Sequence, residues 1–569
     1  MRVTLSKTKN AEHVYISKAY RNENGKSTSK IFKKLGTVEE LLPLHDNERE
    51  KVLQWAKEQA RFYTEAEKND TLNISLKLSE TRQLTIGEMT LFEGGYLFLQ
   101  KLFYETGIGE ACKTVSKNYD FQYNLSSLLS NLVCSRILSP SSKMSSYEYM
   151  NTMIEKPDFS LHDIYRALDV IDKESDNIQS LIYKNGINKR NTSVLYYDCT
   201  NFFFETEDES GIRKYGKSKE HRPNPIVQMG LFLDGDGIPL AFTIFPGNEN
   251  EQPTLIPLEE KILKDYDLSK FIVCTDAGLA SYANRKFNNK PNRAFVVTQS
   301  IKTLPKHIKE WALSPEGFRL PGDGKEYDIS EIDEDVYRNS VFHKERWINE
   351  KGIEQRLVVS YSVKYRNYQR EIRRRQIDRA AHLINGNQNK TRNINSPSRF
   401  IEEIQLTMDG EVAEKCIRTL NTSKIAEEEM YDGFYAVCTT LEDDINTIIK
   451  INRRRWEIEE SFRIMKSEFK ARPVYVQKDE RIRAHFMTCF LALIVFRTLE
   501  KKLDEKYTVS EIIRTLQGMK FQKIKGVGYI PCYTRTEITD ALHEAFGFRT
   551  DKQIVTEKKM KEIIKSTKK

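Results

Sequence analysis

At Ser193 the sequence changes from the spacing of helices to dense β-branched and aromatic residues. Residues 194–204 form the first such run; residues 225–233 and 238–245 follow, separated by the turn sequence at residues 234–237, Asp-Gly-Asp-Gly. Runs of this kind, bounded by Gly and Asp, predict strands, and a short Asp-Gly connection predicts a hairpin. We therefore predict three antiparallel strands, and a central sheet is the strongest constraint on the fold.

The pattern after these strands alternates between helix and strand. Residues 254–264 have helical spacing, residues 271–276 form an apolar strand, and a short helix then leads to a strand at residues 294–298. The order β-β-β-α-β-α-β is an α/β arrangement that matches the ribonuclease-H-like fold. We predict a ribonuclease-H-like catalytic core, with residues 191–300 as its first part.

With 569 residues the chain is too long for one core, so we predict several domains. The fold class is multidomain α/β: the core is interrupted by a mixed, β-containing insertion domain and preceded by a mainly helical N-terminal domain. The predicted boundaries are 1–40 for a β-hairpin module with its turn at Asn22–Gly25, 41–190 for the helical domain, 301–430 for the insertion domain, 431–515 for the second part of the core, and 516–569 for a C-terminal region that dimerises or contacts DNA and frays after Thr550.

Composition limits the function only loosely. The chain is 39% hydrophobic and 10% aromatic, which argues against global disorder, and its net charge of +8 permits a nucleic-acid partner. Eight cysteines without a Cys-x-x-Cys pair indicate neither a zinc knuckle nor a disulfide framework. No stretch looks like a signal peptide or a membrane span of about 20 apolar residues. We expect a cytoplasmic protein without a membrane partner, associated with the nucleoid when it binds DNA.

Two aspartates end predicted strands, Asp198 and Asp276. The ends of neighbouring strands are where two side chains can converge on a ligand. Two carboxylates close together repel unless a cation lies between them, and oxygen ligands without His or Cys favour Mg²⁺ or Mn²⁺ over zinc. A lone aspartate after a strand is more often a turn or cap residue, so the pair needs a third group.

That third group is Glu459, in the predicted helix from Asn452 to Lys466. At about 100° per residue, a continuous helix places a carboxylate among polar and cationic side chains in one stripe: Asn452, Arg455, Glu459, Arg463 and Lys466. Glu459 could hold a metal while the cations bind DNA phosphate. Intrahelical ion pairs, such as Arg455 with Glu459, are an equally good interpretation of the helix alone.

The same segment resembles the third motif of the IS-four-like DDE transposases, which is Tyr, two residues, Arg, three residues, Glu, six residues, Lys. The motif also has Trp after the Arg and Ile before the Glu. Five residues are in register here, Arg455, Trp456, Ile458, Glu459 and Lys466, whereas Asn452 stands in place of the Tyr. The similarity extends to the segments around the two aspartates and to two further segments, Lys217–Pro223 and Phe245–Asn248.

The resemblance implies a transposase that binds the inverted-repeat ends of an insertion sequence, cleaves them by hydrolysis and joins the 3′-hydroxyl ends to target DNA. It implies two Mg²⁺ ions, or Mn²⁺ as substitute, held by Asp198, Asp276 and Glu459, and a homodimer on DNA. In related enzymes a flipped base stacks on an aromatic side chain, for which Trp456 and Trp347 are candidates. Further possible DNA contacts are Lys113, Lys117, Arg136 and Lys143 in the helical domain and Arg373, Arg374 and Arg375 in the insertion domain.

Two other functions remain open. A metal-dependent nuclease on the same fold would cut DNA without joining it. A domesticated descendant would bind DNA without catalysis, although it would have no reason to keep all three carboxylates.

Overall fold

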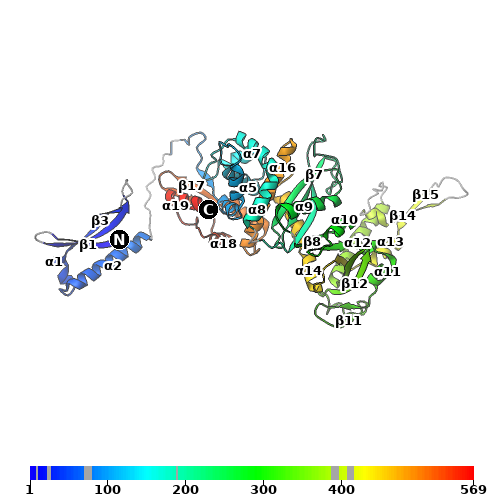
Figure 1. Cartoon of the computed structure of the whole chain (residues 1–569). Helices are drawn as coiled ribbons and strands as arrows, with labels where there is room; N and C mark the ends of the chain where they lie inside the picture. The colour runs from blue at the N-terminus through cyan, green and yellow to red at the C-terminus, as the bar shows by residue number, and fades with distance from the viewer. Residues whose placement is uncertain are drawn as a thin grey trace. The chain divides into compact units, whose positions relative to one another are not determined.

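The computed structural model describes residues 1–7, 11–21, 27–68, 80–81, 83–186, 190–268, 270–385, 396–406 and 415–569. The chain divides into two compact units, Met1–Glu88 and Met89–Lys569. Each unit is described by itself (Figure 1).

The first unit is a small sheet covered by one helix. Three antiparallel strands in the order β1-β2-β3 are followed by three helical segments: β1 (Arg2–Lys7), β2 (Glu12–Arg21), β3 (Ser27–Thr37), α1 (Val38–Leu41), η1 (Leu42–Leu44) and α2 (Arg49–Lys68). Strand β1 adds to the predicted hairpin, whose turn at Asn22–Gly25 lies outside the described residues. The unit runs past residue 40 because Val52 and Ala56 of α2 are buried with Val14 of β2.

The second unit is built on a ten-stranded sheet. Its order is β11-β10-β12-β13-β16-β9-β8-β5-β6-β7. Strand β5 pairs antiparallel with β6 and parallel with β8, and β8 pairs parallel with β9; all other neighbours are antiparallel. The bounds are β5 (Val194–Phe203), β6 (Ile226–Leu233), β7 (Pro239–Pro246), β8 (Phe271–Thr275), β9 (Arg293–Gln299), β10 (Phe318–Arg319), β11 (Glu326–Tyr327), β12 (Phe342–Glu350), β13 (Ile353–Tyr361) and β16 (Phe434–Thr439).

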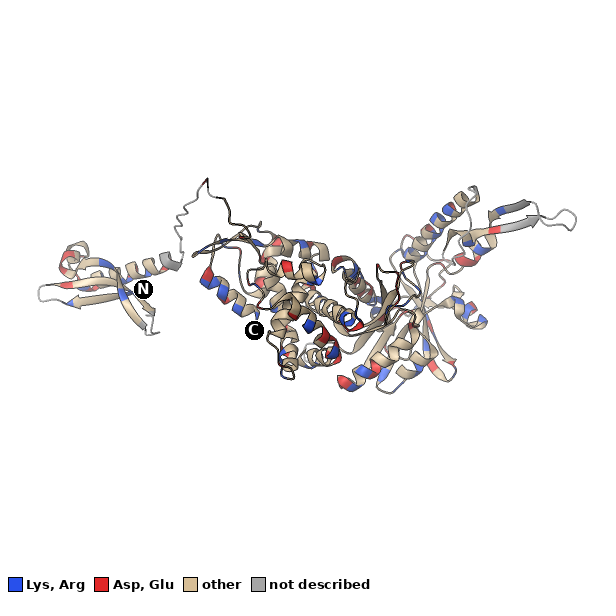
Figure 2. Ribbon diagram, turned by 90° about the horizontal axis from the view of Figure 1, so that it is seen from above, with Lys and Arg blue, Asp and Glu red and all other residues tan. Residues whose placement is uncertain are grey.

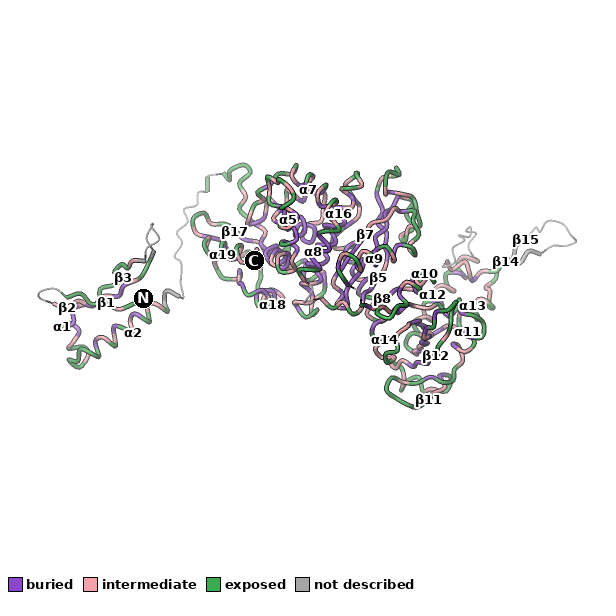
Figure 3. Tube along the Cα trace, viewed as in Figure 1, coloured by how far each residue is buried: buried purple, intermediate pink, exposed green. Residues whose placement is uncertain are grey.

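Helices cover both faces of the sheet around β5. On one face, Leu195 and Tyr197 of β5 are buried in a core with α9. On the other face, Tyr196 and Phe202 belong to the large core that contains the apolar helix α16. Buried residues accordingly fill this part of the unit (Figure 3). Burial on both faces explains why residues 194–204 are an almost continuous apolar run. The helices packed here are α9 (Leu255–Asp265), α10 (Tyr282–Asn288), α14 (Ile445–Arg453), α15 (Trp456–Arg463) and α16 (Asp479–Lys502).

Residues 301–430 add strands to this same sheet. Strands β12 and β13 form a hairpin, and β13 pairs with β16 over six residues. The predicted domain boundaries within the second unit remain predictions. The other elements of this segment are α11 (Lys306–Leu313), α12 (Val363–Asn385), β14 (Ile401–Leu406), β15 (Lys415–Leu420) and α13 (Thr422–Glu429), with the short turns η5 (Ile301–Thr303) and η6 (Pro397–Phe400).

A helical region and a small sheet complete the second unit. Strand β4, from the start of the unit, pairs with β17 near its end, in a four-stranded sheet of order β19-β18-β17-β4. The segment after Thr550, predicted to fray, contains helix α19, because Met560 and Ile563 are buried in the core. The elements are β4 (Leu91–Glu93), α3 (Tyr96–Glu105), α4 (Ile108–Ser116), α5 (Leu125–Leu138), α6 (Lys143–Met150), α7 (Leu161–Lys173), α8 (Ser175–Gly186), α17 (Val509–Gly518), β17 (Lys520–Ile524), β18 (Gly528–Pro531), α18 (Glu537–Phe546), β19 (Val555–Thr556) and α19 (Glu557–Thr567).

Helix α16 is long and apolar enough, by length and composition, to cross a membrane, contrary to the sequence prediction that no stretch approaches this. Of its most apolar 18-residue window, 89% is buried inside the protein. It packs against α5 and α7 and against strand β7, so its apolar surface is accounted for by the protein core.

A buried carboxylic acid gives the fold a testable dependence on pH. Glu259 of α9 is fully buried and accepts two hydrogen bonds of 2.9 Å from the Asn288 amide of α10. Burial raises the pKa of Glu259 from 4.5 to about 8. Because the folded pKa lies above the unfolded one, the stabilising protonated form is complete below about pH 4.5 and is lost as pH rises through 8.

Glu259→Gln keeps a neutral amide at every pH. We expect its melting temperature to exceed that of the wild type at pH 8.5, on the order of a few degrees, and to differ little at pH 5. Scanning calorimetry at both values measures this. Parallel pH profiles for the two proteins would show that Glu259 is not protonated in the folded state.

Candidate functional site

The pairing of β5 with β8 brings two aspartates together. Tyr196 lies beside Cys274 in this parallel pair, so two residues further along each strand Asp198 lies beside Asp276 on the same face of the sheet. Asp276 directly follows β8 and is the N-cap of the turn η4 (Ala277–Leu279). Its Oδ1 accepts a hydrogen bond of 3.1 Å from the Leu279 amide. The cap role that a lone aspartate suggests is therefore real for Asp276, and it leaves the second carboxylate oxygen available.

Asp198 has the environment of a group that attracts a cation. Burial and, to a smaller extent, the charge of Asp276 together raise its pKa to about 7, against the opposing charges of Lys219 and Arg455. Oδ1 of Asp198 accepts a hydrogen bond of 2.7 Å from the Cys199 amide. Two half-buried carboxylates on adjacent strands repel each other, and a divalent cation between them would remove both the repulsion and the cost of burial.

Glu459 comes from helix α15, which packs on β5. Its side chain is 59% exposed, and Oε1 forms an ion pair of 3.1 Å with Arg455. Glu459, Asp198 and Asp276 all lie close enough to Arg455 for their charges to raise its pKa. The single guanidinium therefore offsets part of the negative charge of all three carboxylates. Within the described residues no group of three His, Cys, Asp or Glu side chains lies close enough to hold a metal ion. Arg455 provides the positive charge at this point, and the convergence of all three carboxylates remains a prediction.

The predicted continuous helix is interrupted. Helix α14 ends at Arg453 and α15 begins at Trp456, and a π-helical turn, η7 (Ile464–Glu468), follows α15. The predicted stripe is therefore broken between Asn452 and Arg455 and again before Lys466. Local ion pairs replace it in part: Arg463 pairs with Glu460 at 2.7 Å, as the alternative interpretation of the helix suggested.

A buried network fixes α15 on the sheet. Glu457, which is 4% exposed, pairs with Arg454 at 2.9 Å and with Arg497 of α16 at 3.2 Å. Its carboxylate also lies against Gly237 in the turn between β6 and β7, where a β-carbon would come within 1.6 Å of Oε2. Because Glu457 is two residues from Glu459, this network sets where Glu459 enters the site.

Asn452 and Lys466 have partners distant in sequence. The Asn452 amide donates to the Tyr435 hydroxyl at 3.0 Å, and Tyr435 is also 2.7 Å from the Thr298 hydroxyl. Nζ of Lys466 lies 3.3 Å from Glu220, in the segment between β5 and β6. Burial lowers the pKa of Lys466 to about 8, although the charge of Asp198 opposes this.

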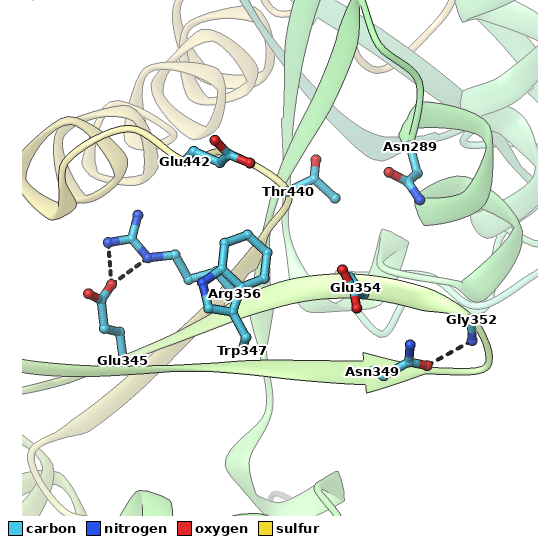
Figure 4. A pocket seen from close by; sticks show the side chains of 9 residues that line it. All are labelled: Asn289, Glu345, Trp347, Asn349, Gly352, Glu354, Arg356, Thr440 and Glu442. Atoms are coloured by element: carbon cyan, nitrogen blue, oxygen red, sulfur yellow. Dashed lines mark hydrogen bonds and ion pairs between the residues drawn. The ribbon is translucent and has the colours of Figure 1, made fainter.

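The two candidate tryptophans lie in different cavities. Trp456, 56% exposed, lines a cavity of about 460 Å³ with Tyr365, Tyr435, Arg455 and Glu459. Trp347 lines a separate cavity of about 990 Å³. Three glutamates line that second cavity, Glu345, Glu354 and Glu442, and Glu345 pairs with Arg356 (Figure 4). The negative lining disfavours DNA near Trp347 and leaves Trp456 as the better candidate.

Several predicted DNA contacts have other roles. Arg373 is only 7% exposed, and its Nη1 donates to Asp432 at 2.8 Å. The prediction that Arg373 contacts DNA is therefore wrong, because the face of α12 that carries it packs inward. Arg374 and Arg375 are exposed but pair with Glu371 on the same helix. Figure 2 shows that basic residues (Lys and Arg) and acidic residues (Asp and Glu) both occur throughout the chain.

Arg136 and Lys143, at 4% and 5% exposure, are also too buried to meet a DNA backbone. Arg136, near the end of α5, donates instead to the carbonyls of Ser141, just after this helix, and of Phe469, at the end of η7.

Four functional-site residues were not identified as individuals from the sequence: Lys219, Tyr435, Glu457 and Arg472. Lys219 belongs to the segment Lys217–Pro223, whose resemblance to transposases was the available signal. The others contact the site through pairings across the fold, for which the local sequence has no signal.

Residues 190–495 match the family model described as "Transposase DDE domain". This is over half of the chain, which therefore belongs to the DDE transposase domain family. No curated protein is a significant match.

Two solved structures show a distant likeness. One is a piggyBac transposase synaptic complex with hairpin DNA, at 9% identity over 74% of this chain and 79% of that chain, with a TM-score of 0.37. The other is the Mos1 transposase paired-end complex with left transposon end, at 13% identity over 46% and 70%, with a TM-score of 0.14. These scores are too low to support a conclusion about this chain.

The contact between Gly237 and Glu457 can be tested with a matched pair of glycines. Gly237 has φ +78° with Glu457 in the way of a β-carbon, and Gly526, in the turn between β17 and β18, has φ +77° with nothing within 4 Å. Alanine at either position strains the backbone, but only Gly237→Ala also displaces Glu457. We expect Gly237→Ala to lower the melting temperature by on the order of 2–4 °C more than Gly526→Ala, and to lower cleavage activity. Equal losses would mean that the contact does not hold α15.

Proposed function

We propose that this protein is an IS-four-like transposase that binds the inverted-repeat ends of an insertion sequence, cleaves them and joins the 3′-hydroxyl ends to target DNA. The observation that carries the proposal is the pair Asp198 and Asp276 on adjacent parallel strands, covered by the helix that bears Arg455 and Glu459. The strand order β7-β6-β5-β8-β9, with β8 and β9 parallel to β5, supports a ribonuclease-H-like core.

Asp198, Asp276 and Glu459 would hold one or two Mg²⁺ ions, or Mn²⁺. The oxygen-only donor set fits a hard divalent cation, and so do the burial and the repulsion from Asp276 that raise the pKa of Asp198. Such a cation supplies activation of the entering oxygen and stabilisation of the leaving one in an in-line displacement at phosphorus. Glu459 would be the third ligand if it were released from Arg455, and the exposure of its side chain leaves it free to move.

Arg455 then has a second task. Once Glu459 leaves it, the guanidinium keeps its charge, because the neighbouring carboxylates and Tyr435 raise its pKa against the effect of burial. A planar guanidinium binds phosphate in two-pronged fashion, so Arg455 would orient the scissile phosphate over Asp198 and Asp276. Lys466, close enough to Asp198 to feel its charge, would bind the same or the next phosphate.

The cavity beside Glu459 suits an unstacked base. Trp456 and Tyr365 are exposed aromatic rings, and Tyr435 and Asn452 provide hydrogen-bonding groups at its wall. Stacking on aromatic side chains stabilises a base that has left the duplex. Cleavage of two ends in concert implies a homodimer on DNA, and the protein would act in the cytoplasm on nucleoid DNA.

Replacing any one of Asp198, Asp276 and Glu459 with Ala should reduce cleavage of end DNA below detection while binding changes little, because metal ligation and DNA docking use different groups. A gel assay with labelled ends and a target plasmid in Mg²⁺ measures cutting and joining together. Free ends that are never joined would identify a nuclease; binding without cutting by the wild type would identify a DNA-binding descendant.

The pKa of Asp198 predicts how cation binding depends on pH. Because this pKa is raised to about 7, the carboxylate is largely protonated at pH 6 and must lose its proton to bind Mn²⁺. Calorimetric titration should give an affinity that falls about fivefold from pH 7 to pH 6 and only about twofold from pH 8 to pH 7. Asp198→Asn should bind Mn²⁺ more weakly and with a flatter profile, and a wild-type affinity independent of pH would exclude Asp198 as a ligand.

A further inference from the structure

A cluster of cations lies next to Asp198, and Lys466 is the member of it that the family motif contains. Glu220 bridges two of them: it lies 3.3 Å from Nζ of Lys466 and forms an ion pair with Arg472. The guanidiniums of Arg472 and Arg222 lie 5.1 and 4.2 Å from the centre of the Phe203 ring. Lys219 completes the cluster beside Asp198, where it pairs with Glu251 at 3.1 Å.

The segment that carries Glu220 is fixed to strand β5. Asn201, only 3% exposed, donates to the Lys217 carbonyl at 3.1 Å and accepts from the Lys219 amide at 3.3 Å. Nζ of Lys219 also donates to the Cys199 carbonyl at 2.6 Å. The cations are therefore held in a defined position relative to Asp198.

The charges of this cluster do not balance. Four cations, Lys219, Arg222, Lys466 and Arg472, face three carboxylates, Glu220, Glu251 and Asp198, and among the described residues Arg222 has no acidic partner within ion-pair distance. The bridging group remains accessible, since the side chains of Lys466, Glu220 and Arg472 are 15%, 25% and 22% exposed. An excess of cations on the surface around a replaceable carboxylate is the arrangement that a phosphate ligand requires.

We propose that Lys466, Arg472 and Arg222 form a binding subsite for a DNA backbone phosphate beside Asp198, and that Glu220 occupies this subsite until DNA displaces it. The proposal rests on the proposed function. A carboxylate and a phosphate present similar anionic oxygens to Lys and Arg, so Glu220 competes with DNA for the same cations. It also keeps Lys466 and Arg472 next to each other before DNA arrives.

Removing the charge of Glu220 should therefore strengthen DNA binding. We would measure fluorescence anisotropy of a 25-base-pair duplex of arbitrary sequence, in EDTA so that no cleavage occurs, at a series of NaCl concentrations. Glu220→Gln should bind about 3–10 times more tightly than the wild type at low salt. The matched control is Glu428→Gln, because Glu428 is likewise a partly exposed partner of an arginine, at 17% exposure, and lies in helix α13; the DNA affinity of this variant should equal that of the wild type.

Removing a cation should have the opposite effect. Arg472→Ala should weaken binding and reduce the slope of log affinity against log salt by about 0.9, the value for one phosphate contact, and Arg472→Lys should restore the slope. A merely structural ion pair would instead lower the melting temperature of both Glu220→Gln and Arg472→Ala and leave the salt slope unchanged, which would overturn the subsite.

The outcomes separate the subsite from the proposed function. If the wild type binds DNA and joins ends but Glu220→Gln binds no more tightly, only the subsite is wrong. If the wild type binds no DNA at any salt concentration, the proposed function fails and the subsite fails with it.

Discussion

The parallel pairing of β5 and β8 is the contact on which the site depends. It sets Asp198 and Asp276 side by side on one face of the sheet, where their repulsion and partial burial cost free energy. The cost is offset by cations from three separate places: Arg455 at the start of α15, Lys219 in the segment between β5 and β6, and Lys466 in the π-helical turn. Two further contacts hold these cations in place. The ion pair of Glu457 with Arg497 fixes helix α15, and Asn201 anchors the segment between β5 and β6.

This arrangement explains why Glu459 is exposed and paired with Arg455. Three carboxylates cannot stay close together without a compensating cation, and the guanidinium provides one positive charge where a metal ion would provide two. The Glu459 side of this ion pair is exposed to solvent, which screens the attraction, so Glu459 can exchange Arg455 for a metal ion. Glu220 is paired in a similar way with Lys466 and Arg472, the cations that the proposed phosphate subsite would use.

Local pattern was enough to predict the strands around β5 and to single out Asp198 and Asp276 as candidates. The Asp-Gly-Asp-Gly turn and the apolar runs around it gave β6 and β7 within about a residue, because hairpins depend on adjacent sequence. The pairing of β13 with β16 joins segments that are distant in sequence, and local pattern does not contain it. Similarly, a run of arginines predicts a charged helix but not which face of that helix packs inward. Arg373 was therefore predicted to contact DNA, whereas the structure buries it against Asp432. The link between Lys466 and Glu220 spans 246 residues and was equally out of reach.

The central claim is that Asp198, Asp276 and Glu459 act as one cation site for DNA cleavage. The most direct measurement is a crystal structure of the protein with a cleaved DNA end and Mn²⁺, with the ion located from its anomalous scattering. The account predicts Mn²⁺ bound by Asp198 and Asp276, with Glu459 released from Arg455 to join them and Arg455 on a phosphate. Mn²⁺ bound away from both aspartates, or Glu459 still paired with Arg455 in the DNA complex, would contradict it.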